Sequence, residues 1–447
     1  MSVVHHDRAR AIGGVTRALL CALGSVAFFV VSFCVGPASA SAGVGDDLFR
    51  ARYTIGTTTD ARFGTNSLAK VDNLFDSQLL DDLSNGGYDP LSTPVVANLD
   101  LRGVEAVAGF RQGETAFFFE VEAAGIDISF DKGDRDESLE EFQRWLKGGV
   151  DTPTSPAEAV TSLFQAFVAD SAVDPVAGNP FSLQTRMMQS PYDIAMRAAF
   201  RPDDETAPDE DGVVWSGKDV FDLRTDYAPF WGGDWNGFMV DLAFKYTLNL
   251  KEPRLAFIFD MPVAYTQTEG DAHTATAHAG VGMLIRATPW WNVLTEGRVG
   301  LSGSLQLGGL AVLYSTGVTS HMQWQLGDTT LRMGNAFTAS SSIDGIEWLG
   351  YELTYGITNY LVRNGFEVER RLPGRVRGNP LFARLIFNDN WVLGSDVYVD
   401  HYNEVGVHFG TTRSMGSGAV RDRSSLGLTY TGAQDYHALR VSLNYAF

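Results

Sequence analysis

The chain has 447 residues, with 54 acidic and 34 basic side chains, a formal net charge of −20 and a mean hydropathy of −0.06. So negative a charge argues against a nucleic-acid-binding protein, because phosphate binding needs a basic surface. After residue 40 no apolar run approaches the roughly 20 residues of a membrane-spanning helix, which excludes a helical transporter. A hydrophobic content of 45% and an aromatic content of 12% exclude a wholly disordered chain.

Residues 1–42 are predicted to be a signal peptide for export. Three arginines precede an apolar run over 18–35, and the small residues 38–40 follow it. This order of charged, apolar and small residues is typical of a cleavable signal peptide, with an uncleaved membrane anchor as the alternative. Both cysteines of the chain, Cys21 and Cys34, lie in this segment. The exported protein is therefore expected to form neither a disulfide nor a thiolate metal site.

Residues 43–212 are predicted to form a smaller α+β region that is periplasmic, a plug or an insert. Two strand-like segments, 101–110 and 115–130, precede three helix signals: an apolar face within 139–146, and helix starts at Ser155-Pro156 and Ser190-Pro191. The acidic, proline-containing segment 202–212 indicates a linker. In the alternative, 101–130 is a barrel hairpin, which would give fourteen barrel strands with 131–212 inserted between them.

The last strand carries the strongest signal in the sequence. Its apolar side chains stand at every second position and end on an aromatic residue: Leu439, Val441, Leu443, Tyr445 and Phe447. The residues between them are small or polar, so one face of the strand is apolar and the other is not. This ending resembles the terminal signature of bacterial outer-membrane barrels, which implies recognition by the barrel-assembly machinery.

Residues 213–447 are predicted to form an all-β transmembrane antiparallel barrel of about 12 strands. The expected strands lie near 214–226, 237–249, 254–267, 274–287, 291–302, 310–326, 329–339, 357–371, 380–389, 404–412, 423–431 and 437–447. Six charged residues are expected to point into the lumen: Asp241, Lys245, Asp260, Arg286, Arg298 and Arg440. These charges would be too costly in the dry core of a soluble barrel. An apolar outside with a polar inside is the arrangement of a transmembrane barrel.

The even strand number predicts that both ends of the barrel segment face the periplasm. The connections then alternate between the two sides of the membrane. Segments 340–356 and 390–402, the two longest connections, are expected to be extracellular, whereas 250–253, 327–328 and 373–379 are expected to be periplasmic. Long outer loops and short inner turns are the usual asymmetry of such barrels.

Candidate catalytic motifs are weak. Asp400-His401 lies in a predicted loop, and His273 and His278 match no common metal-ligand spacing. No nucleophile-elbow pattern surrounds the serines near His321. We therefore expect no catalytic residue, no cofactor and no metal site, and interpret the lumen charges as a structural network.

The strand count, the segment 399–406 and the ending 439–447 together resemble the autotransporter-type outer-membrane barrel domain of the solitary kind, without a large passenger. The resemblance covers about half of the chain. It implies a place in the Gram-negative outer membrane and a structural or surface-interaction role. Outer-membrane lipid, lipopolysaccharide, the barrel-assembly machinery and periplasmic chaperones are the implied partners. A small-solute porin-like channel and an outer-membrane hydrolase are the alternative functions.

Overall fold

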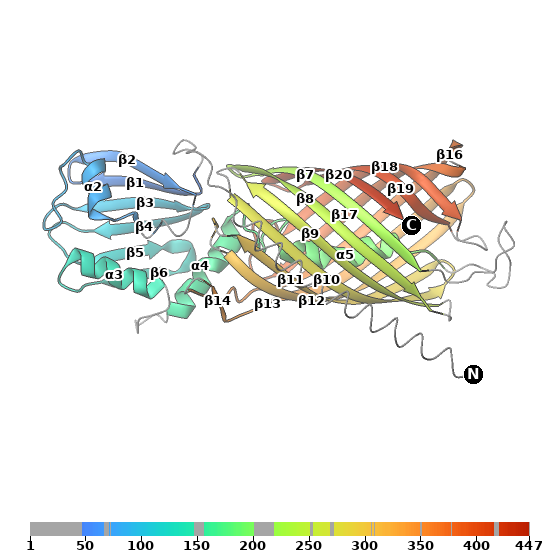
Figure 1. The fold of residues 1–447 in the computed structure, drawn as a ribbon, viewed down its shortest axis with the longest axis horizontal. Helices are drawn as coiled ribbons and strands as arrows, with labels where there is room; N and C mark the ends of the chain where they lie inside the picture. The colour runs from blue at the N-terminus through green and yellow to red at the C-terminus, as the bar shows by residue number, and fades with distance from the viewer. Residues whose placement is uncertain are drawn as a thin grey trace, which may run out of the picture.

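The computed structural model describes residues 47–66, 71, 73–146, 156–200, 219–250, 254–268, 272–304, 306–307, 309–348, 351–376, 378–414 and 420–446. They form an N-terminal sheet with helices and a closed barrel, set end to end (Figure 1). The predicted signal segment 1–42, the linker 202–212 and Phe447 lie outside the described residues. Within the described residues, no helix is long and apolar enough to cross a membrane.

The N-terminal domain is built on a six-stranded antiparallel sheet in the order β2-β1-β3-β4-β5-β6. The strands are β1 (Phe49–Ile55), β2 (Thr58–Thr65), β3 (Val95–Leu101), β4 (Val104–Phe110), β5 (Phe117–Val121) and β6 (Ile126–Phe130), with a short 3-10 turn η2 (Glu122–Ala124). Every second side chain of β1 is buried, so one face of the sheet forms a core. The sequence prediction placed strands only over 101–130 and missed β1, β2 and most of β3.

In the described part of the chain, three helices pack beside this sheet: α2 (Ser77–Leu83), α3 (Arg135–Leu146) and α4 (Pro156–Asp170). The Asp134 carboxylate accepts hydrogen bonds from the amides of Asp136 and Glu137, which caps the start of α3. Phe142 of α3 then packs against Phe117 of β5, with ring centroids 4.8 Å apart. The two later helix predictions have different outcomes. Pro156 is the first residue of α4, as expected, but Ser190-Pro191 begins no helix.

The barrel has twelve antiparallel strands, closed in the order β10-β11-β12-β13-β16-β17-β18-β19-β20-β7-β8-β9. They are β7 (Val220–Gly232), β8 (Trp235–Asn249), β9 (Leu255–Thr268), β10 (Ala272–Thr288), β11 (Trp291–Ser304), β12 (Gly309–Leu326), β13 (Thr329–Ile343), β16 (Thr358–Val376), β17 (Asn379–Gly394), β18 (His401–Ser414), β19 (Val420–Gly432) and β20 (Tyr436–Ala446). A small hairpin, β14 (Ile346–Trp348) and β15 (Tyr351–Leu353), lies between β13 and β16. The predicted fold class is confirmed, and the fourteen-strand alternative is wrong because 101–130 pairs within the N-terminal sheet.

The two faces of the barrel wall differ as the sequence predicts. On β17, Leu385 and Phe387 are exposed on the outside, whereas Arg384 and Asn388, which flank them, are buried inside. The same alternation runs through β20, where Val441 and Leu443 are exposed and Ser442 is buried. An apolar outside and a charged inside are the inverse of a soluble barrel.

The two ends of the barrel are distinct. At the end we call the domain end, the connections 233–234, 344–357, 395–400 and 433–435 face the N-terminal domain. The Tyr398 amide there donates to the Val168 carbonyl of α4 at 3.0 Å. At the other end, the terminal end, β7 begins and β20 finishes, and the fully described connections 289–290 and 327–328 are each two residues long (Figure 1).

Candidate functional site: the helix-filled lumen

One helix, α5 (Leu183–Met196), lies inside the barrel against β10, β11, β12, β13 and β16 (Figure 1). All of its residues except Ser190 and Asp193 are buried, although half of the helix is polar. A helix with polar residues around it is stable in such a place only where the surrounding wall supplies partners. Pro191 lies within α5, where it removes one backbone hydrogen bond.

Glycines in the barrel wall make room for this helix. A side chain at Gly300 on β11 would collide with Met187, and one at Gly334 on β13 would collide with Tyr192. Gly365 on β16 is directly opposite Gly334 in the strand register. Inward-facing glycines therefore form a shallow channel in the wall, into which the large side chains of α5 fit.

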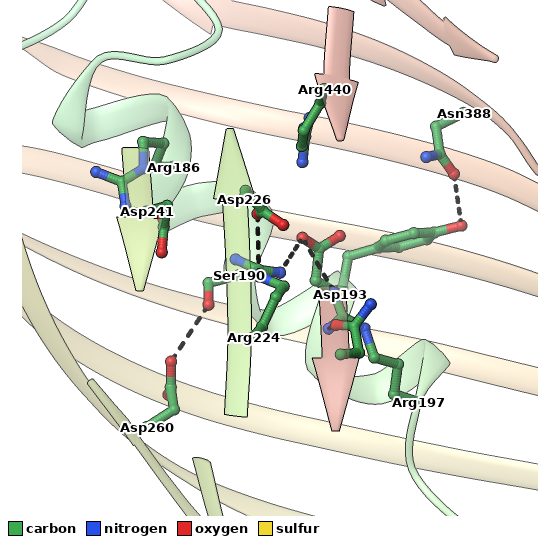
Figure 2. A network of polar contacts seen from close by, with 12 residues as sticks. Arg186, Ser190, Asp193, Arg197, Arg224, Asp226, Asp241, Asp260, Asn388 and Arg440 are labelled. Atoms are coloured by element: carbon green, nitrogen blue, oxygen red, sulfur yellow. Dashed lines mark hydrogen bonds and ion pairs between the residues drawn. The ribbon is translucent and has the colours of Figure 1, made fainter. Parts of the chain in front are cut away.

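Asp193 is the centre of the polar network that joins α5 to the wall (Figure 2). Its carboxylate lies 3.3 Å from a guanidinium nitrogen of Arg224 on β7 and 3.3 Å from one of Arg363 on β16. Arg363 also pairs with Glu404 of β18 at 2.7 Å, and Glu404 pairs with Arg440 of β20 at 2.6 Å. One acidic residue of the helix is thus connected to four strands of the wall.

A second group of charges surrounds the first half of α5. Arg186 forms an ion pair with Asp241 of β8 and donates to the Thr276 hydroxyl of β10 at 2.5 Å. Arg298 of β11 pairs with Asp260 of β9 at 2.5 Å and also contacts Glu296. Each of these side chains is almost completely buried, so the attraction between them is only weakly screened by water.

A cavity of about 130 Å³ remains beside α5, on the side of β7, β8, β18, β19 and β20. Its lining combines apolar side chains with charges of both signs, including Asp193, Arg224, Lys245 and Arg440. A space of this size holds a few water molecules. Among the described residues, α5 therefore occupies much of the lumen, and small cavities lie beside it.

The domain end of the lumen is covered by the N-terminal domain. Arg102, at the tip of the β3–β4 hairpin, is completely buried and lies 3.9 Å above the Phe167 ring of α4. Its guanidinium is 3.6 Å from the carboxylate of Asp174, in the segment between α4 and α5. Burial lowers the pKa of Arg102 below its usual value. The backbone of Arg102 has a φ of 61°, a conformation that side-chain-bearing residues rarely adopt.

The structure brings most of the predicted lumen charges into pairs. Asp241, Asp260, Arg298 and Arg440 belong to the network around α5, and Lys245 pairs with Asp222 at 2.9 Å. Arg286 donates to the Ala199 carbonyl, just after α5, at 3.1 Å. On the terminal strand, the outward row consists of Leu439, Val441, Leu443 and Tyr445, of which the last three are exposed.

The sequence interpretation missed the residues at the centre of the network. Arg363 and Glu404 occupy inward positions of predicted strands, so the alternation already indicated which way they point. Asp193 and Arg186 could not be found in this way, because nothing in the local sequence places their helix inside the barrel. The glycines at 300, 334 and 365 were the available signal for an object against the wall.

Comparison with known structures gives likenesses that cover about half of the chain. No family model and no curated protein match the chain. Among solved structures, the β-domain of the Bordetella autotransporter BrkA is similar over 51% of this chain and 98% of that one, with 12% identity and a TM-score of 0.39. The translocator domain of NalP from Neisseria meningitidis is similar over 51% and 88%, with 15% identity and a TM-score of 0.33. The KdgM porin is similar over 50% and 99%, with 8% identity and a TM-score of 0.31.

Proposed function

We propose that this protein is an autotransporter-like outer-membrane barrel without a large passenger, which holds its N-terminal domain at the cell surface. In this role α5 crosses the lumen and closes it, and the domain serves a structural or surface-interaction function. The observation that carries the proposal is the position of the domain, at the barrel end opposite to the start of β7 and the finish of β20.

Two features support this orientation. In a barrel with an even number of strands, both termini of the barrel segment lie on the same side, which is the periplasmic side in bacterial outer-membrane barrels. The long connections 344–357 and 395–400 lie at the domain end, and long connections are typical of the extracellular side. Both arguments support a position of the domain outside the cell.

The filled lumen favours a closed barrel over a small-solute channel. The helix is held by buried ion pairs to β7, β8 and β16, and the cavity beside it is only about 130 Å³. We therefore expect the wild-type protein to conduct weakly or not at all in planar bilayers. A stable large conductance from the intact chain would favour the porin-like alternative.

Protease treatment of intact cells tests the orientation. We expect an added protease to degrade epitopes in the N-terminal domain while the barrel stays intact, with a periplasmic protein as the control for membrane integrity. Degradation of the domain only after the outer membrane has been permeabilised would contradict the proposal.

We propose further that periplasmic chaperones deliver the chain and that the barrel-assembly machinery binds its last strand. Deletion of Phe447 is expected to lower the amount of folded barrel in the outer membrane, because the terminal aromatic residue is part of the sequence signature. The heat-modifiable band in membrane fractions measures this amount. An unchanged band in the deletion variant would refute the role of the ending.

A further inference from the structure

The outside of the barrel wall is largely apolar and carries a polar patch near the domain end. A row of five residues crosses the neighbouring strands β17, β18, β19, β20 and β7, one residue on each strand. Each residue is the cross-strand partner of the next: Asp389, Asn403, Gly432, His437 and Trp231. They share the outward face of their strands with exposed residues such as Phe387 and Val405. We call this row, with the adjacent Trp391, His401 and Tyr430, the rim patch.

The side chains of the rim patch are joined to one another. The Trp391 indole nitrogen donates to one carboxylate oxygen of Asp389 at 2.9 Å, and His401 Nε2 lies 2.8 Å from the other. The rings of Trp391 and His401 are stacked with centroids 3.9 Å apart. On the next hairpin, the Tyr430 hydroxyl lies 2.7 Å from His437 Nδ1.

Gly432 allows the second half of the patch to form. A side chain at Gly432 would meet the Tyr430 ring at 2.9 Å, so this ring lies across the space that the glycine leaves. The hydroxyl of Tyr430 thereby reaches His437, whose ring centroid is 6.0 Å from that of Trp231. The result is a surface with aromatic rings at both ends and hydrogen-bonding groups between them.

The patch continues the lipid-facing surface, so its partner in the membrane is a lipid. His401 and His437 stand at the start of β18 and β20, which places the patch at headgroup level rather than at the membrane midplane. Contact through the phosphate groups of a lipid fits poorly, because the described residues of the rim patch include no Lys or Arg and Asp389 contributes a carboxylate. A sugar ring fits well, since its C–H face packs on an aromatic ring while its hydroxyls bond to carboxylate, amide and imidazole groups.

We propose that the rim patch binds uncharged sugar units, rather than the phosphates, of an outer-leaflet glycolipid, lipopolysaccharide. This proposal rests on the proposed orientation, because lipopolysaccharide is found in the outer leaflet only. Trp391 and Trp231 supply the stacking faces, and Asp389, Asn403 and His437 supply the hydrogen-bonding groups. The lipid chains continue along the apolar outward residues of the same strands.

The full chain, refolded into phosphatidylethanolamine vesicles, tests the proposal. Addition of rough lipopolysaccharide is expected to raise the thermal unfolding temperature, and phosphatidylglycerol is not. Trp391→Leu and Asp389→Leu should each weaken lipopolysaccharide retention, after extraction in mild detergent, by about threefold or more. Trp290→Leu, an equally exposed tryptophan at the terminal end, should retain as much as wild type.

The heat-modifiable band verifies that each variant has folded. The site would be refuted if Asp389→Leu retained as much lipopolysaccharide as wild type, or if phosphatidylglycerol raised the unfolding temperature as much as lipopolysaccharide does. It would also be refuted if the wild-type barrel retained a second copy of itself in place of the lipid. The orientation is read separately from protease treatment of cells. If the domain were periplasmic and lipopolysaccharide retention still depended on Trp391, the orientation would be refuted but the binding of lipopolysaccharide by the rim patch would not.

Discussion

Tyr192 of α5 fills the space that the missing side chain of Gly365 leaves on the lumen wall. Its hydroxyl donates to Asn388 Oδ1 on the neighbouring strand at 3.0 Å. A Cβ atom at Gly365 would collide with that hydroxyl and with Asn388. The helix and the wall are therefore complementary in shape at this point, and the fit can be removed by a single substitution.

Gly365→Val is expected to displace α5 and to open the lumen. Overpacking of a close contact costs about 1–3 kcal/mol. This cost is enough to displace the helix in part of the molecules. Bilayer recordings should detect conductance that wild type lacks. Gly297→Val is the matched control, because Gly297 has no neighbouring atom in the way of a side chain. If neither variant conducts, the close fit between Tyr192 and Gly365 is not what keeps the lumen closed.

Asp193→Asn is expected to destabilise the packing of α5 in the lumen. The change leaves the guanidinium groups of Arg224 and Arg363 with one fewer anionic partner. Breaking a fully buried ion pair costs about 3–5 kcal/mol, and the partly buried Asp193 should cost less than that. The urea midpoint of the barrel in vesicles measures the effect, and the exposed Asp127→Asn on β6 is the control. A midpoint equal to that of the control would show that Asp193 contributes little to the network.

Arg102→Ala is expected to loosen the N-terminal domain from the barrel. The guanidinium packs on Phe167 and faces Asp174, and the alanine variant keeps neither contact. Hydrogen exchange of the Tyr398 amide, which is bonded to Val168, should become faster. Arg102→Gly should accelerate this exchange less, because glycine relieves the unfavourable φ of 61°. The exposed Arg52→Ala should leave exchange unchanged.

Phe257→Arg is expected to lower the folded yield of the barrel. Phe257 is exposed on the outside of β9 as its third residue. A charged side chain on the lipid face costs about 2–4 kcal/mol at the membrane midplane and less toward the interface, so we expect a cost below the midplane value. Leu91→Arg is the control, since Leu91 is 79% exposed in the N-terminal domain. Equal yields of the two variants after refolding into vesicles would refute the outward assignment of Phe257.

Much of the barrel could be predicted because one face of each strand is apolar and the other is not. A register error of one residue would reverse every side chain, so the alternation fixes both the strands and their sidedness. The first strand shows the limit of this method. It was placed at 214–226 but spans Val220–Gly232, and it continues through Pro229, a residue that normally ends a strand.

The contents of the lumen could not be predicted in the same way. The sequence around α5 has no single apolar face, because its surroundings are polar on one side and glycine-lined on the other. Ser190-Pro191 was therefore interpreted as a helix start, where proline is normally tolerated, although the helix begins at Leu183. Tertiary packing of Tyr192 and Asp193 compensates for the hydrogen bond that Pro191 removes.

The position of α5 between a folded domain and a closed wall constrains the order of assembly. The six-stranded sheet is roughly 28 Å wide at the usual spacing of about 4.7 Å between strands, so the folded domain cannot pass through a lumen that a single helix fills. In the proposed orientation the domain must cross as an extended chain, or the wall must close around α5 after the domain has crossed. Residues 43–447 contain no cysteine. The oxidising periplasm therefore cannot cross-link this segment before it has crossed, and folding of the sheet outside would make the crossing irreversible.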